Sequence, residues 1–137
     1  MARILVVDDE QEVAMMITRM IKPFGHWVDF VCSIPDALIL VQGSVGQPFD
    51  LLVTDHDIKE SGTCFDFLTR GLSECPDLFP RRVLVMSGFF PDDMDEQMAS
   101  LCEQGFIPLC MQKPVHLSIL IPFVNCLLSL HRVEAAE

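Results

Sequence analysis

The amino-acid sequence predicts one α/β domain, a (βα)5 fold with a doubly wound parallel five-stranded sheet of order 2-1-3-4-5. Two observations lead to this prediction. Five short apolar runs have the length and β-branched content of strands buried on both faces, and the stretches between them are long enough for crossover helices. Right-handed crossovers place those helices on both faces of the sheet. The chain has the usual size of one domain, so we expect residues 1–137 to be a single unit with no output domain.

The predicted strands are short and almost wholly apolar. They span residues 4–7, 27–31, 51–54, 83–86 and 107–111. A strand covered on both faces needs no alternation of polar and apolar residues, so continuous apolar runs indicate a parallel sheet between two layers of helices.

The predicted helices fill the intervals between these strands. They span about residues 10–24, 34–42, 63–73, 92–104 and 117–131. The first has apolar residues at helical spacing and stops at Pro23-Phe24-Gly25. Ser33 is the expected N-cap of the second helix, and Gly105 terminates the fourth.

The composition excludes several kinds of partner and site. Twenty acidic and nine basic residues give a net charge of −11, which repels nucleic-acid phosphates and anionic lipids, so we expect no nucleic-acid or membrane partner. The six cysteines form no C-x-x-C pair, and therefore indicate neither a zinc site nor a redox motif. We expect a cytoplasmic protein, because the apolar start lacks a cleavage site and the longest apolar stretch is too short for a bilayer.

Polar residues follow four of the predicted strands directly. They are Asp8 and Asp9 after the first strand, Asp55 and Asp57 after the third, Ser87 after the fourth and Lys113 after the fifth. The carboxyl ends of parallel strands meet at one edge of a sheet, so these side chains are expected to lie close together. Carboxylates within about 5 Å of one another repel by several kcal/mol per pair, so they share protons or surround a cation.

The chemistry of these residues favours magnesium and phosphoryl transfer. Carboxylate oxygens suit Mg²⁺, and strand alternation turns the nearby His56 away from Asp55, which leaves no zinc-type ligand set. A carboxylate beside a bound divalent metal is a nucleophile toward phosphorus. Lys113 would neutralise phosphoryl oxygens and the Ser87 hydroxyl would bond to one of them. The set therefore predicts phosphorylation of Asp55.

Four segments at the ends of the predicted strands resemble the signature stretches of response-regulator receiver domains, in the correct order along the whole chain. They are Ile4-Leu5-Val6-Val7-Asp8-Asp9-Glu10, Asp50-Leu51-Leu52-Val53-Thr54-Asp55, Val83-Leu84-Val85-Met86-Ser87-Gly88 and Lys113-Pro114. The resemblance implies a flavodoxin-like fold similar to that of the chemotaxis regulators. It also implies a phosphodonor that is a histidine kinase or a histidine phosphotransfer protein, and Mg²⁺ as the cofactor.

The resemblance also implies roles for single residues. Asp55 matches the phosphoacceptor, Asp9 the carboxylate bound directly to Mg²⁺, Asp8 one that acts through water, and Asp57 the position whose backbone carbonyl binds the metal. Ser87 matches the switch hydroxyl and Lys113 the cation that pairs with the phosphoryl group, with a cis peptide bond commonly before Pro114. Such a domain catalyses its own phosphorylation and dephosphorylation without being a turnover enzyme.

Three features depart from the receiver pattern. Cys110 stands three residues before the lysine, where an aromatic switch residue is usual. Asp57 adds a carboxylate beside the site, which predicts a changed phosphoryl lifetime. The helix at 117–131 has little polar surface, so we expect either a homodimer or output-partner surface at the strand 4–helix 5 face or a helix covered by neighbouring loops.

Two other functions stay open at this point. Asp55-His56-Asp57 also fits the D-x-D nucleophile motif of haloacid-dehalogenase-type phosphatases, although the acidic pair that those enzymes need after the lysine is missing. A degenerate receiver that works as an unphosphorylated binding module is the other alternative.

Overall fold

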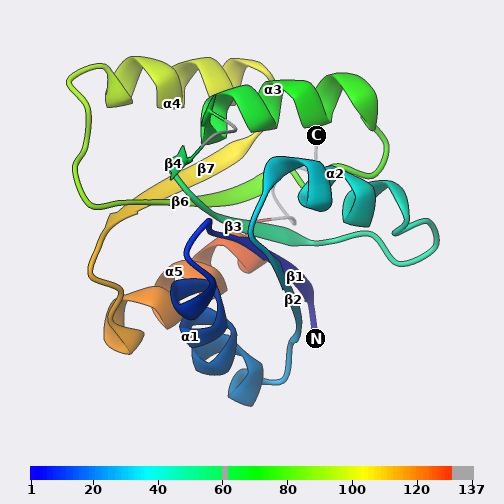
Figure 1. Cartoon of the computed structure of the whole chain (residues 1–137), viewed down its shortest axis with the longest axis vertical. Helices are drawn as coiled ribbons and strands as arrows, with labels where there is room; N and C mark the ends of the chain where they lie inside the picture. The colour runs from blue at the N-terminus through cyan, green and yellow to red at the C-terminus, as the bar shows by residue number, and fades with distance from the viewer. Residues whose placement is uncertain (60–61, 131–137) are drawn as a thin grey trace.

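The structure, a computed structural model, describes residues 1–59 and 62–130, and within them five parallel strands form one sheet of order β2-β1-β3-β6-β7 (Figure 1). Its strands are β1 (Arg3–Val7), β2 (Trp27–Val31), β3 (Leu51–Asp55), β6 (Arg82–Ser87) and β7 (Ile107–Gln112). The helices are α1 (Gln11–Ile21), α2 (Ile34–Gln42), α3 (Cys64–Glu74), α4 (Met94–Glu103) and α5 (Leu117–Ser129). The predicted fourth and fifth strands are β6 and β7, so the observed strand order is the predicted order 2-1-3-4-5 and the fold class is confirmed.

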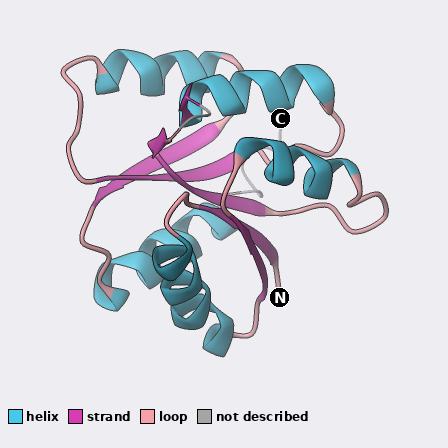
Figure 2. Cartoon of the chain, in the orientation of Figure 1, coloured by secondary structure: helices cyan, strands magenta, loops and turns pink. Residues whose placement is uncertain are grey.

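The sheet lies between two layers of helices (Figure 2), and it separates two apolar cores. On one face α2, α3 and α4 pack on strand residues such as Leu5 and Val7; on the other α1 and α5 pack on Ile4 and Val6. Neighbouring residues of β1 thus point to opposite faces, as the pleat requires. Covering both faces explains why the strands are continuous apolar runs.

The helix boundaries differ from the sequence prediction in a few places. The first helix ends at Ile21, and Pro23 lies in a separate 3-10 turn, Lys22–Phe24, that is closed by Gly25 at φ +93°. The fourth begins at Met94 rather than at residue 92, because residues 92–93 form a turn that the Met94 amide closes by donating to the Pro91 carbonyl at 3.0 Å. Ser33 is confirmed as a cap, since its Oγ accepts a hydrogen bond from the Asp36 amide at 3.2 Å. The predicted end of the fifth helix at residue 131 lies outside the described residues.

A small two-stranded hairpin follows β3 and was not predicted. It consists of β4 (Asp57–Ile58) and β5 (Gly62–Thr63), paired antiparallel. Strands of two residues carry no periodicity, so the sequence gives no signal for them. The hairpin leads into α3, where the Thr63 amide donates to Asp66 Oδ2 at 3.3 Å. In the part of the chain that the structure describes, no helix is long and apolar enough to cross a bilayer.

Gly71 lies where α3 meets Phe79, and its missing side chain is required there. A Cβ at Gly71 would lie 2.0 Å from Cε1 of Phe79, whose ring packs edge-to-face on Phe67. We expect Gly71→Ala to lower the free energy of unfolding by about 1–3 kcal/mol, measured by urea denaturation, because the ring must leave its packing position. Gly43→Ala is the control, since a Cβ there meets its nearest atom at 3.5 Å. Equal denaturation midpoints for the two variants would contradict the expectation.

Candidate functional site

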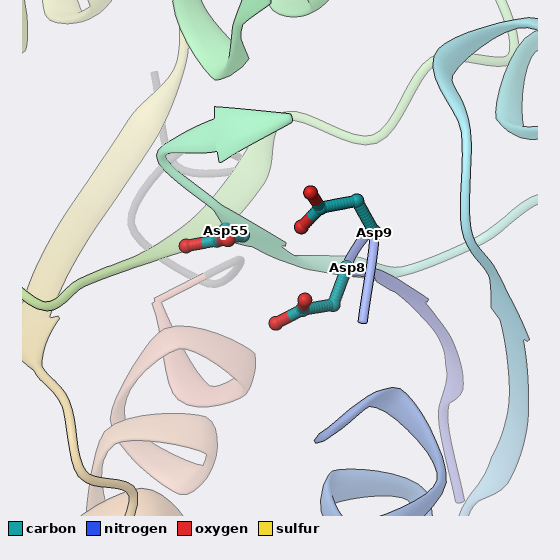
Figure 3. Close-up of side chains that lie close together, drawn as sticks. All are labelled: Asp8, Asp9 and Asp55. Atoms are coloured by element: carbon teal, nitrogen blue, oxygen red, sulfur yellow. The ribbon is translucent and has the colours of Figure 1, made fainter. Parts of the chain in front are cut away.

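Three carboxylates meet at the carboxyl edge of the sheet, where the neighbouring strands β1 and β3 end (Figure 3). Asp8 and Asp9 follow β1, and Asp55 ends β3; the parallel pairing of Val7 with Thr54 brings those two strand ends side by side. Each of the three side chains has an oxygen within 4.8 Å of the others. This edge of a doubly wound sheet is where ligands bind in such folds.

Burial sets the electrostatics of this cluster. Asp8 is fully buried and the side chain of Asp55 is 13% exposed. Burial raises the pKa of Asp55 from 3.8 to about 6, with the Asp8 charge adding to the rise and Lys113 opposing it. Burial likewise raises the pKa of Asp8, although the Glu10 amide, which donates to Asp8 Oδ1 at 2.9 Å, favours its ionised form.

Lys113 is the cation of this pocket. Its Nζ lies 3.0 Å from Asp8 Oδ2 and 3.3 Å from Asp55 Oδ1, so one ammonium group bridges the two strand ends. Burial alone lowers the pKa of Lys113, but the hydrogen bond and the charge of Asp8, together with the charge of Asp55, outweigh it and the pKa is raised. The Lys113 amide donates to the Ser87 carbonyl at 2.8 Å, and the bond before Pro114 is cis, as the resemblance implies.

The residues in the pocket fit a hard divalent cation. The group that the structure brings together among its described residues is made of carboxylates alone, the ligand type that Mg²⁺ prefers. Three ionised carboxylates against one ammonium leave two negative charges without compensation in a half-buried site. A bound dication would offset that deficit, and its charge would lower the pKa of Asp55, which burial raises.

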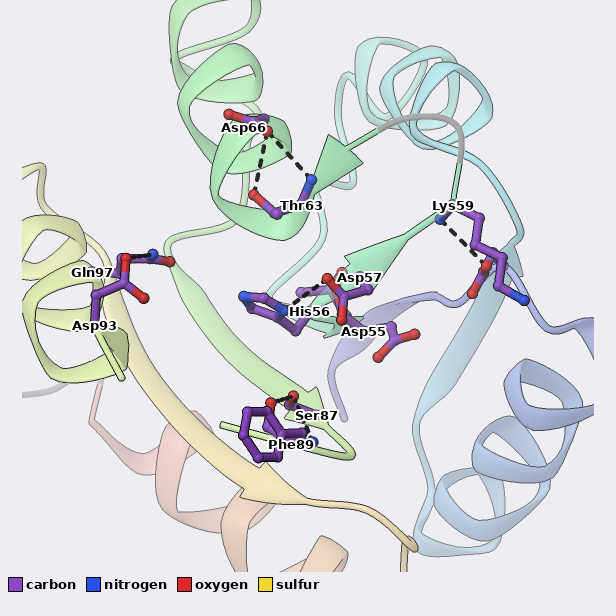
Figure 4. Close-up of polar contacts among 12 residues, drawn as sticks. Asp55, His56, Asp57, Lys59, Thr63, Asp66, Ser87, Phe89, Asp93 and Gln97 are labelled. Carbon is purple, nitrogen blue, oxygen red and sulfur yellow. Dashed lines mark hydrogen bonds and ion pairs between the residues drawn. The ribbon is translucent and has the colours of Figure 1, made fainter. Parts of the chain in front are cut away.

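Two predicted site residues have their side chains outside this cluster (Figure 4). The Asp57 carboxylate is 77% exposed and lies 3.1 Å from Nδ1 of His56, so the two carboxylates of Asp55-His56-Asp57 do not share one pocket. The Ser87 hydroxyl donates to the Phe89 carbonyl at 2.5 Å and accepts from the Phe89 amide at 3.2 Å. It is engaged by its own loop and not by Asp55.

Two contacts at the site were missed by sequence reasoning. The Lys59 amide donates to Asp9 Oδ2 at 3.3 Å, and Nδ1 of His56 lies 3.1 Å from Oδ1 of Asp57, the first residue of β4. Backbone amides leave no signature in a sequence, and the strand β4 was not predicted.

The fifth predicted helix exposes apolar surface. Its residues Leu120, Val124 and Leu127 are buried on the sheet, whereas Leu117 and Ile119 are exposed. β6 lies inside the sheet with its side chains covered, so surface in this region comes from α5. That a second copy or an output partner binds here stays a prediction.

Comparison with known proteins shows the fold of this chain, and it does so through structure alone. No family model matches the sequence, and no curated protein sequence matches it. Among solved structures, the CheY-like receiver domain protein of Methanospirillum hungatei JF-1 superimposes with a TM-score of 0.79 at 16% identity, covering 98% of each chain. The CheY4 chemotaxis protein of Vibrio cholerae gives 0.78 at 19% identity, over 93% of this chain and 98% of that one. This chain has the response-regulator receiver fold.

A third receiver fold shows the same agreement over nearly the full chain. The non-phosphorylated HemR receiver domain of Leptospira biflexa matches with a TM-score of 0.76 at 22% identity, covering 95% of this chain and 96% of that one. In the receiver fold of this chain, the three aspartates occupy the sheet edge at which β1 and β3 end.

Proposed function

We propose that this chain is a receiver domain that accepts a phosphoryl group on Asp55 from a histidine kinase or histidine phosphotransfer protein. Mg²⁺ would be held by Asp8, Asp9 and Asp55, with the backbone carbonyl of Asp57. The observation that carries the proposal is the meeting of three carboxylates and the Lys113 ammonium at the carboxyl edge of a receiver fold. In this proposal the protein is a cytoplasmic phosphoprotein of a two-component phosphorelay.

The chain's own groups have defined tasks in the transfer. A carboxylate oxygen of Asp55 attacks the phosphorus atom, the bond from phosphorus to the donor nitrogen breaks, and the product is an acyl phosphate. Asp55 attacks as the anion, and a pKa of about 6 leaves most of the molecules ionised at neutral pH. Bound Mg²⁺ would supply positive charge that offsets the charge on the phosphoryl oxygens.

Lys113 and Ser87 would act on the phosphoryl oxygens. The Lys113 Nζ already lies 3.3 Å from Asp55 Oδ1, so it needs little movement to contact a group bonded there. Ser87 needs a larger change, because its hydroxyl must leave the Phe89 carbonyl before it can donate to a phosphoryl oxygen. This exchange of partners would be the first step of the conformational signal.

Incubation with Mg²⁺ and acetyl phosphate tests the proposal. We expect the intact mass to increase by one phosphoryl group, with no increase in Asp55→Asn, because the amide is not a nucleophile toward phosphorus. Asp92→Asn is the matched control, since it removes one exposed carboxylate outside the site and should be labelled normally. An unlabelled wild-type protein would overturn the proposal and favour an unphosphorylated binding module.

A further inference from the structure

His56 is a rigid, buried neighbour of the proposed phosphoacceptor. It is 8% exposed, its amide donates to the Met86 carbonyl at 2.8 Å, and its carbonyl accepts from the Cys64 amide at 2.7 Å. The ring packs edge-on against Phe65, with 5.3 Å between the ring centroids. Backbone and ring are therefore both fixed, and Nδ1 has a defined direction.

Nδ1 of His56 is a buried polar atom that completes no hydrogen bond in the described structure. The acceptor within reach is Oδ1 of Asp57, at 3.1 Å. Because the Asp57 side chain is 77% exposed, a small rotation of its carboxylate completes the bond without disturbing the core. A buried ring nitrogen gains much from such a partner, so the pair has a physical reason to form.

The position of Asp57 gives this pair a consequence for the site. Asp57 begins β4 two residues after Asp55, but its carboxylate faces His56 and is outside the Asp8, Asp9 and Asp55 cluster (Figure 4). A free carboxylate so close to three others and a bound dication would be drawn toward the cation. The affinity of oxygen sites for divalent cations depends on the number of charged ligands.

We propose that His56 is a positioning residue that holds the Asp57 carboxylate outside the aspartate cluster, by donating Nδ1–H to Oδ1. The inference rests on the proposed function, since it concerns the same magnesium site. With Asp57 held in this way, three carboxylates remain in the pocket, and Asp57 would contact the metal only through its backbone carbonyl. The tuning of the site depends on a side chain that touches neither metal nor phosphoryl group.

Magnesium titration by calorimetry at pH 7.5 tests the proposal in four variants and the wild type. We expect His56→Leu to bind Mg²⁺ about threefold to tenfold more tightly, because Asp57 is then free to join the cluster. His56→Asn should bind like wild type, since its amide nitrogen stands close to the position of Nδ1. Asp57→Asn alone is the reference, and His56→Leu added to it should change nothing.

Two results would overturn the positioning role. One is an effect of His56→Leu that persists in the Asp57→Asn background, which would mean that His56 acts through packing. The other is unchanged or weaker binding by His56→Leu. A measurement on the wild type covers the case in which His56→Leu does not fold: ¹⁵N spectra should show a proton on Nδ1, and a bare Nδ1 with the proton on Nε2 would overturn the proposal.

Mass spectrometry of the same proteins separates this inference from the proposed function. If the wild type is phosphorylated but the effects of His56→Leu and Asp57→Asn on Mg²⁺ affinity are independent, only the role of His56 is overturned. Coupling in the magnesium titration without any phosphorylation would support His56 and overturn the phosphoacceptor role of Asp55.

Discussion

Replacing Lys113 with methionine is expected to slow the phosphorylation of Asp55 by about 10²–10³-fold, the usual cost of removing one preorganised group that stabilises transition-state charge. Nζ lies 3.3 Å from Asp55 Oδ1 and 3.0 Å from Asp8 Oδ2, so its charge acts on the pocket at short range. Methionine keeps much of the length of the side chain and removes the charge. The rate of intact-mass gain with acetyl phosphate at fixed Mg²⁺ measures the effect.

The loss must come from the position of the charge and not from the net charge. Arg70→Met on the exposed face of α3 removes one positive charge away from the site, where Arg70 pairs with Glu74, and should be labelled at the wild-type rate. Lys113→Arg should retain part of the rate, because it restores the charge with a different shape. Labelling of Lys113→Met within about threefold of wild type would show that the ammonium has no part in the transfer.

Asp55→Asn is expected to stabilise the metal-free protein at pH 7.5, by up to about 3 kcal/mol for a pKa raised from 3.8 to about 6. Between these pH values the folded chain keeps a proton on Asp55 that the unfolded chain has released. The folded state thus binds more protons there, and this group makes the free energy of unfolding fall as the pH rises from about 4 to about 6. Asparagine removes that dependence.

Urea denaturation in a chelator, at pH 4 and at pH 7.5, measures this effect. The advantage of Asp55→Asn over wild type should be small at pH 4 and full at pH 7.5, and Asp92→Asn, which removes an exposed carboxylate, should show no such gain. Saturating Mg²⁺ should stabilise the wild type and reduce the difference, because binding to the folded state alone adds to its stability. A variant no more stable than wild type at pH 7.5 would mean that the buried carboxylate costs nothing.

The five-stranded sheet and its helices were predictable because each of these elements has a local signal. Neighbouring residues predict the continuous apolar strands, the helix stop at Pro23 and the helix cap at Ser33. Right-handed crossovers between parallel strands then allow few topologies. The differences lie at the ends of elements, where for example a 3-10 turn or a β turn replaces the last or first helical turn, and in the small β4–β5 hairpin, which was not predicted.

The candidate site was predictable as a set of residues but not as an arrangement. The sequence places Asp8, Asp9 and Asp55 at strand ends, and parallel pairing does bring these three together. It gives no sign that Ser87 bonds to the Phe89 backbone or that Asp57 faces His56. Those contacts depend on side-chain rotamers and on local backbone geometry, which only the assembled fold determines.

The Ser87 hydroxyl has two competing partners, the backbone of Phe89 and the proposed phosphoryl group on Asp55. Phe89 is 78% exposed, so its loop is accessible to other molecules. The Ser87 hydroxyl that bonds to this loop is also the group that would donate to the proposed phosphoryl group. The hydroxyl proton of Ser87 can be donated to the Phe89 carbonyl or to the phosphoryl group, but not to both. By thermodynamic reciprocity, a molecule that binds this loop in its present conformation disfavours phosphorylation of Asp55. The factor is the same as that by which phosphorylation lowers the affinity of the loop for that molecule.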